Sequence, residues 1–171
     1  MKVIVSKGAF LGILAASLEA YKKESIGLLF GSRGEKNIII KLAFPPQTAK
    51  RFYASAEIGT KAEKRLVSIF EHFAHMKLVG FFHSHPEYGD TQGETKLSNA
   101  DINSLKDEEI AIVIAINRSS RSHEWRANTD GSISGTVDHY LFKMAGYLRI
   151  KDNGQPKMIP ITMKIKGLLL H

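Results

Sequence analysis

The sequence predicts an α/β or α+β domain in which helices flank a mixed β-sheet. Three observations lead to this prediction. Several apolar runs have the length of strands, and they outnumber the segments with helical periodicity. The two main helical segments fall between these runs rather than after them. A length of 171 residues and an apolar fraction of 43% suit one ordinary core, so we expect residues 1–171 to form a single domain.

The first part of the chain is expected to form a strand, a helix and a β-hairpin. Lys2–Ser6 has the pattern of a strand, and Ser6 can cap a helix that runs to about Lys23. Two apolar runs follow, at residues 25–30 and 38–44, and the intervening Gly31-Ser32-Arg33-Gly34 favours a turn between antiparallel strands. The helix is supported by apolar residues at helical spacing, namely Phe10, Leu14, Leu18 and Tyr21.

The remainder of the chain continues this alternation. From about Glu57 the apolar spacing predicts a second helix with one buried face. Residues 78–82 and 110–116 are short apolar runs that predict buried strands, and a short helix is expected to begin at Ser98 between them. Residues 124–127 and 132–137 predict a hairpin, and the clean alternation over 159–165 predicts a half-buried strand. The apolar positions of the second helix are Ile58, Ala62, Leu66, Ile69, Phe70 and Phe73.

Composition excludes several kinds of chemistry. The chain has no cysteine, which removes disulfides, thiolate nucleophiles and cysteine–zinc sites. No apolar stretch approaches the roughly 18 residues of a membrane helix, so we expect a cytoplasmic protein with no membrane partner. The net charge of +7 comes from lysines and arginines that are scattered along the sequence, so nucleic acid is not the expected partner.

His83 and His85 are the first candidates for a functional site. Side chains two residues apart in a strand point the same way, so both imidazoles should face one side at the end of a buried strand. Such a pair is half of a metal site, although a surface turn with two unrelated histidines fits the pattern equally well.

Three more polar residues can complete such a site. Ser98 and Asp101 have the spacing of a helix capping box, and a carboxylate held by a helix start can also be a third zinc ligand. Glu24 precedes an apolar strand. Taken alone it fits a solvated residue, but a hydrolytic zinc site also needs a proton carrier that is not on the metal.

Together these segments resemble the JAMM/MPN+ family of zinc metallo-isopeptidases, in its prokaryotic single-domain type. The resemblance rests on Glu24, Gly27-Leu28-Leu29-Phe30-Gly31, His83-Ser84-His85-Pro86 and Ser98-Asn99-Ala100-Asp101, all in the family's order, and covers about residues 1–147. It implies the cytidine-deaminase-like MPN fold, a curved mixed sheet flanked by helices.

The same resemblance implies the roles of these residues. His83, His85 and Asp101 would hold one Zn²⁺ per chain, Glu24 would carry the proton, and Ser98 would donate a hydrogen bond to the oxyanion. The implied activity is hydrolysis of an amide or isopeptide bond after the C-terminal tail of a ubiquitin-like or sulfur-carrier protein. Two alternatives stay open, a non-catalytic MPN scaffold and a RadC-like protein with a nucleic-acid-linked role.

Two segments depart from the family pattern. Twelve residues separate His85 from Ser98, a longer interval than usual, and we expect this loop, about 87–97, to bulge outward and to affect access more than metal binding. A C-terminal extension begins at about Lys151. Its apolar end, Gly167-Leu168-Leu169-Leu170, is expected either to pack into the fold or to form a homodimer.

Overall fold

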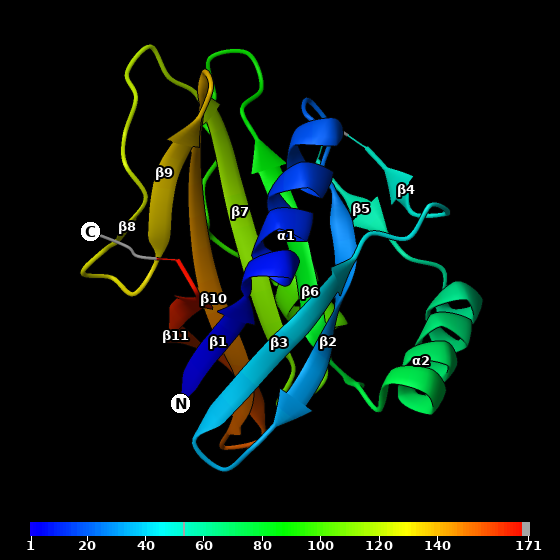
Figure 1. The fold of residues 1–171 in the computed structure, drawn as a ribbon. Coiled ribbons are helices and arrows are strands. Elements are labelled where there is room, and N and C mark those ends of the chain that lie inside the picture. The colour runs from blue at the N-terminus through cyan, green and yellow to red at the C-terminus, as the bar shows by residue number, and fades with distance from the viewer. Residues whose placement is uncertain (53, 169–171) are drawn as a thin grey trace.

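A computed structural model describes residues 1–52 and 54–168 of the chain. One large sheet dominates it, with the first helix packed against the sheet and the second beside it (Figure 1). The elements are β1 (Lys2–Ser6), α1 (Lys7–Glu19), β2 (Ile26–Arg33), β3 (Asn37–Phe44), β4 (Lys50–Arg51), β5 (Ala56–Glu57), α2 (Thr60–Ala74), β6 (Lys77–Pro86), α3 (Asn99–Ser104), β7 (Ile110–Arg118), β8 (Arg126–Ala127), β9 (Ile133–Val137), β10 (Tyr140–Asp152) and β11 (Gln155–Lys166).

The main sheet is mixed, as predicted, but its curvature goes as far as closure. Its strand order is β11-β1-β3-β2-β6-β7-β10-β9-β8, and β11 also pairs with β10. Strand β11 therefore bridges β1, to which it is parallel, and β10, to which it is antiparallel. The extension after residue 151 is thus a structural strand of the sheet, and β10 before it is a strand that the sequence analysis did not predict.

Helix α1 fills the inner side of the curved sheet. Ser6 caps it as predicted, its hydroxyl accepting a hydrogen bond from the Ala9 backbone amide at 3.1 Å. The helix ends at Glu19, somewhat before the predicted end near Lys23. Phe10 and Ile13 are buried in the core, and the Trp125 ring packs edge-on against Phe10 at 5.0 Å. Burial of this helix therefore holds the sheet in its curved shape.

Helix α2 is placed differently from the prediction. It forms where expected, but none of its residues is buried, and Ile69 and Phe73 are 52% and 79% exposed. Phe70 makes aromatic contacts with the sheet, with Phe30 at 4.3 Å and Phe44 at 5.4 Å. The predicted buried face is therefore wrong, because α2 lies beside the sheet rather than across it (Figure 1).

The predicted strands are longer than their apolar runs. Gly31, Ser32 and Arg33 belong to β2, which pairs with β3 antiparallel through a bulge after Phe30, so the hairpin turn comes at residues 34–36. Strand β6 continues past Phe82 through residues 83–86. Flanking strands β2 and β7 supply hydrogen bonds to these polar residues, which local apolarity alone does not reveal.

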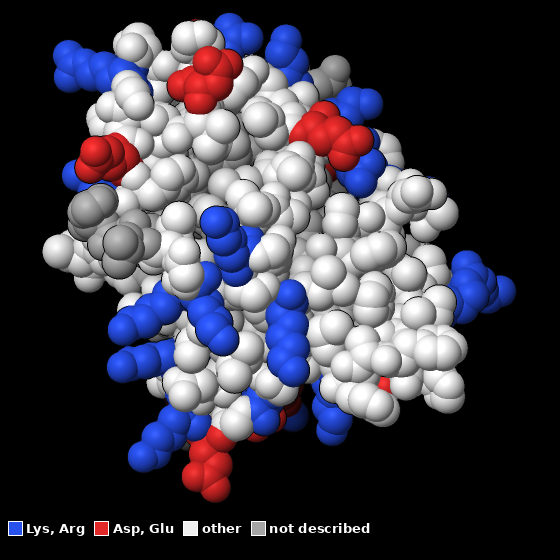
Figure 2. Space-filling model, viewed as in Figure 1, with Lys and Arg blue, Asp and Glu red and all other residues white. Residues whose placement is uncertain are grey.

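Charge is unevenly distributed over the surface. Lysine and arginine side chains gather over the lower part of β1 and β3 (Figure 2). Strand register explains this. Lys2, Lys41, Lys164 and Lys166 are exposed on three neighbouring strands, and the residues next to them along each strand, such as Val3, Ile40 and Ile165, face the core. Residues that are scattered along the chain are therefore brought together by the parallel pairing of β11, β1 and β3.

Two further predictions concern a membrane span and the C-terminal end. Within the described residues, no helix is both long and apolar enough to cross a membrane. Of the apolar C-terminal end, Leu168 packs against the core, while residues 169–171 lie outside the described part. The homodimer therefore stays a prediction.

The position of β11 leads to a matched pair of substitutions. Met163 is 2% exposed on its inner side, whereas Lys164 is exposed on its outer side. We expect Met163→Ala to lower the free energy of unfolding by about 2–5 kcal/mol, because it leaves a cavity in the core. We expect Lys164→Ala to change it by no more than about 0.5 kcal/mol. Urea denaturation of both variants checks this, and equal stabilities would contradict a structural role for β11.

Candidate metal centre

Strand β6 presents its alternate residues to two different environments. Phe82 and Ser84 face the core and are fully buried, whereas His83 and His85 face the opposite side. Gly27 on β2 makes this possible, since a Cβ atom there would lie 2.2 Å from the Phe82 ring. Both histidines are thus held on one side of a strand that is paired on both edges, as the sequence analysis predicted.

Asp101 completes a compact group with the two histidines. One potential ligand atom from each of His83, His85 and Asp101 lies within 4.8 Å of the others. Asp101 Oδ1 is 3.6 Å from His83 Nε2, and the two imidazole centroids are 4.8 Å apart. The structure therefore brings all three sequence-predicted ligands together, although they come from β6 and α3.

His83 has a buried ring nitrogen, Nε2, that has no hydrogen-bond partner among the described residues. Burial lowers the pKa of His83 to about 4, against the opposing influence of the Asp101 carboxylate. The imidazole is therefore neutral near pH 7, which is the form that binds a metal ion.

His85 is oriented through its other ring nitrogen. Its Nδ1 atom lies 2.7 Å from the backbone carbonyl oxygen of Glu94. Because a carbonyl oxygen can only accept, Nδ1 carries the proton and donates it, and the Nε2 lone pair is left for a ligand. Histidines that bind a metal through one ring nitrogen typically donate a hydrogen bond through the other, often to a backbone carbonyl.

Asp101 is held by a capping box, as the sequence predicted. The Ser98 backbone amide and hydroxyl both donate to Asp101 Oδ2 at 2.7 Å, and the Asp101 amide donates to Ser98 Oγ at 3.1 Å. Burial alone would raise the pKa of Asp101, but His83 and the Ser98 hydrogen bonds lower it overall. Oδ2 is thus occupied by Ser98, and Oδ1 is directed at His83.

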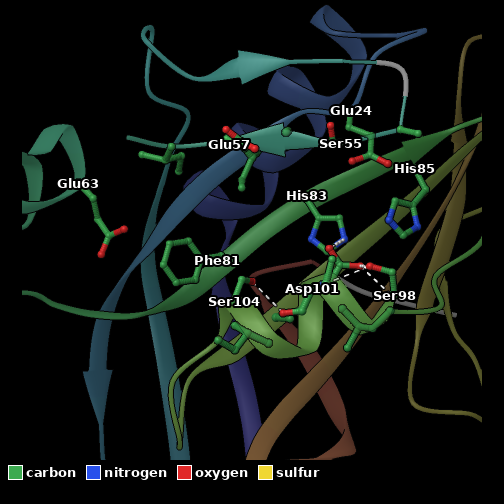
Figure 3. A pocket seen from close by; sticks show the side chains of 18 residues that line it. Glu24, Ser55, Glu57, Glu63, Phe81, His83, His85, Ser98, Asp101 and Ser104 are labelled. Carbon is green, nitrogen blue, oxygen red and sulfur yellow. Dashed lines mark hydrogen bonds and ion pairs between the residues drawn. The ribbon is translucent and has the colours of Figure 1, made fainter. Parts of the chain in front are cut away.

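Glu24 lies beside this group, and its carboxylate points toward the two imidazole rings (Figure 3). Its backbone amide donates to the Phe52 carbonyl at 2.8 Å. Burial, and then the Asp101 charge, raise the pKa of Glu24 to about 7. A carboxyl group with such a pKa can both accept and release a proton near neutral pH.

A buried serine pair fixes the distance between Glu24 and the histidines. The Ser25 backbone amide donates to Ser84 Oγ at 2.9 Å, and the Ser84 amide donates to the Ser25 carbonyl at 2.9 Å. Ser25 follows Glu24, and Ser84 lies between the two histidines. Sequence analysis did not assign this role to either serine, although Ser84 belongs to the motif that it singled out.

All five predicted site residues line one cleft, with a volume of about 480 Å³. Four carboxylates line it, from Glu24, Glu57, Glu63 and Asp101, and no lysine or arginine is among its described lining residues. The cleft is therefore negative within a protein of net charge +7, which favours the approach of a cation.

The donor set fits a divalent metal ion. Two imidazole nitrogens and one carboxylate oxygen converge, and the Nε2 atom of His83 has no hydrogen-bond partner among the described residues. Three protein ligands of these types are typical of a zinc site that leaves one position for water or substrate.

The curved mixed sheet packed against α1, with this three-residue group on its outer side, is the arrangement of a JAB/MPN-type domain. Residues 6–128 match the family of prokaryotic homologues of the JAB domain, well over half of the chain, so the protein belongs to that family. Strands β10 and β11, which close the sheet, lie beyond the matched segment.

Comparison with solved structures agrees on the fold. The solution structure of protein DSY2949 from Desulfitobacterium hafniense has a TM-score of 0.59 and 16% sequence identity, covering 98% of this chain and 94% of that one. At this identity the likeness concerns the fold alone. No curated protein matches the sequence.

The raised pKa of Glu24 has a consequence for stability. The folded-state value, about 7, lies above the ordinary 4.5, so between these values the folded state holds more protons and stability falls as pH rises. We expect metal-free Glu24→Gln to gain stability relative to wild type from pH 5 to pH 8, by about 1 kcal/mol once solvent screening is allowed for. Denaturation in chelator measures this, and a pH-independent difference would refute it.

Proposed function

We propose that this protein is a zinc-dependent metallopeptidase that hydrolyses an amide or isopeptide bond. The bond cleaved would follow the C-terminal tail of a ubiquitin-like or sulfur-carrier protein and would join that tail to an amine of the rest of the substrate. The observation that carries the proposal is the convergence of His83, His85 and Asp101 beside a carboxyl group, Glu24, whose pKa is about 7. Membership of the JAB family supports it.

His83, His85 and Asp101 would hold the zinc ion. When bound, zinc supplies Lewis acidity, which acidifies water and polarises a carbonyl group. The protein prepares the site by keeping His83 neutral, by directing the His85 Nδ1 proton to Glu94, and by occupying Asp101 Oδ2 with Ser98. Each ligand is thus oriented by contacts that leave one donor atom available.

Glu24 would carry the proton. It takes a proton from the attacking water and later delivers it to the departing amine, and a pKa near 7 suits both directions. Its backbone is fixed by the Phe52 carbonyl and by the Ser25–Ser84 pair. A substrate carbonyl bound in the cleft would therefore meet the carboxyl group at a defined place.

Ser98 would stabilise the oxyanion. Its hydroxyl now donates to Asp101 Oδ2 at 2.7 Å, and rotation about the Cβ–Oγ bond redirects that proton toward a bound substrate oxygen. The Ser98 backbone amide keeps its own bond to Asp101 during this rotation. Asp101 would then stay in place while the hydroxyl changes partner.

The cleft suits a narrow polypeptide segment. Its volume of about 480 Å³ is that of a typical ligand pocket, too small for a folded domain. Apolar Ile26, Phe81 and Leu105 line it together with the polar residues. An extended tail with small terminal residues would place its last carbonyl group beside His83, while the folded part of the substrate stays outside.

The first experiment combines metal analysis with cleavage. Protein purified without chelator should contain about one zinc per chain and cleave a suitable ubiquitin-like fusion. Glu24→Gln should keep the zinc and lose about 10²–10⁴-fold in kcat, because only proton transfer is removed. Wild type in chelator is the metal-free control. Absence of metal from correctly folded protein would exclude the metallopeptidase and favour a scaffold.

The role of Ser98 can be separated from its capping function. Ser98→Ala should lower kcat by about 10²-fold or more, as loss of an oxyanion donor does, and also cost about 1 kcal/mol of stability through the lost cap. Ser6→Ala is the matched control, because Ser6 caps α1 away from the cleft. Equal losses of kcat in both variants would show that Ser98 acts only through stability.

A further inference from the structure

The loop of residues 87–97 is exposed at residues 88–92 but contacts the candidate metal centre at Glu94. Its Glu94 carbonyl oxygen accepts the hydrogen bond from His85 Nδ1 at 2.7 Å. The loop therefore supplies the hydrogen-bond partner of one candidate ligand, and its effect on access stays a prediction.

Asn117 holds the loop at the residue before Glu94. The Gly93 backbone amide donates to Asn117 Oδ1 at 2.7 Å, and Asn117 Nδ2 donates to the Gly93 carbonyl at 3.1 Å. The side-chain amide of Asn117 thus pairs with both polar groups of one backbone residue, as a neighbouring strand would. These two hydrogen bonds fix the position and orientation of the adjoining peptide.

Tyr147 holds the loop at the residue after Glu94. Its hydroxyl donates to the Thr95 carbonyl at 2.8 Å. Gly93 packs so closely that a Cβ atom there would lie 2.0 Å from the His85 carbonyl oxygen. The peptide that carries the Glu94 carbonyl is therefore fixed on both sides, by β7 and by β10, and no side chain fits between the loop and β6 at Gly93.

The start of the loop is anchored as well. Glu87 accepts hydrogen bonds from the Tyr21 hydroxyl and from the Arg118 backbone amide, both at 2.7 Å. These contacts join the loop to the end of α1 and to β7. A loop with such anchors at its beginning and around Glu94 presents a fixed carbonyl, which a solvated loop of the same length does not.

We propose that Asn117 and Tyr147 are positioning residues for the metal ligand His85, acting through the Glu94 carbonyl. The fixed carbonyl keeps the proton on Nδ1 and the ring in one orientation, so Nε2 is available as the metal donor. Without the two anchors the ring can rotate or take the other tautomer, and metal binding must then first restore the competent state. The inference rests on the proposed metal site, but the tautomer of His85 in metal-free protein does not depend on the metal.

The test uses the full chain and two readouts. The His85 tautomer is read from ¹⁵N–¹H correlation spectra of the imidazole in metal-free protein, and zinc affinity is measured by chelator competition. We expect Asn117→Ala and Tyr147→Phe each to populate the Nε2–H tautomer and to weaken zinc binding about 10–100-fold, with Tyr147→Phe at the lower end. Two variants serve as matched controls. One is Asn128→Ala, because the Asn128 side-chain amide donates hydrogen bonds to Ser132 and Ser134 and not to the 87–97 loop. The other is Tyr140→Phe, on the same strand as Tyr147.

The outcomes separate the positioning role of Asn117 and Tyr147 from the proposed zinc site itself. A changed tautomer with weakened zinc binding in the test variants, and neither change in the controls, supports the positioning role. An unchanged Nδ1–H signal and unchanged zinc affinity in folded variants overturn it. If Asn117→Ala does not fold, Tyr147→Phe decides, since it removes only one hydroxyl. If wild type binds no zinc, the proposed function fails, while the tautomer spectra still decide whether Asn117 and Tyr147 orient His85.

Discussion

The site depends on the alternation of side chains along β6. Pairing with β2 and β7 on its two edges leaves this strand no freedom to slip. A shift of one residue would place His83 in the core and Phe82 in the cleft, at a large cost in buried apolar surface. The hydrophobic core therefore selects the register, and the register in turn directs both imidazoles to the side where Asp101 and Glu24 lie.

Most polar groups of the site have hydrogen-bond partners within the protein. Ser98 donates to Asp101 Oδ2, and His85 Nδ1 donates to the Glu94 carbonyl, while the buried Nε2 of His83 has no hydrogen-bond partner among the described residues. A buried polar atom without a hydrogen bond destabilises a fold by about 1–3 kcal/mol, so the Nε2 atom of His83 fits a role as a metal ligand. Burial, and then the Asp101 charge, raise the pKa of Glu24, and the carboxylates of the cleft favour a cation at the same point.

Much of the fold and most of the site could be predicted from local patterns. The Ser6 cap, the β2–β3 hairpin and the Ser98–Asp101 capping box are short-range features that depend on neighbouring residues, and all three form. The buried face of α2 was wrong, because periodicity shows that a helix has an apolar side but not that another element will cover it. Strand β10 was missed, although Phe142, Met144, Gly146 and Leu148 alternate inward along it.

The sequence by itself determined two local pairs, His83 with His85 and Ser98 with Asp101, because spacing within a strand and within a helix start is set by backbone geometry. That these pairs meet beside Glu24 was implied by the resemblance to the JAMM/MPN+ family. The sequence could not determine what the long-range packing decides. The closure of the sheet by β11 requires a parallel partner from the other end of the chain, and the contact of Glu94 with His85 requires Asn117 and Tyr147 from two other strands. Such contacts join residues far apart in sequence, where neither periodicity nor propensity carries information, so only the tertiary structure could bring them into view.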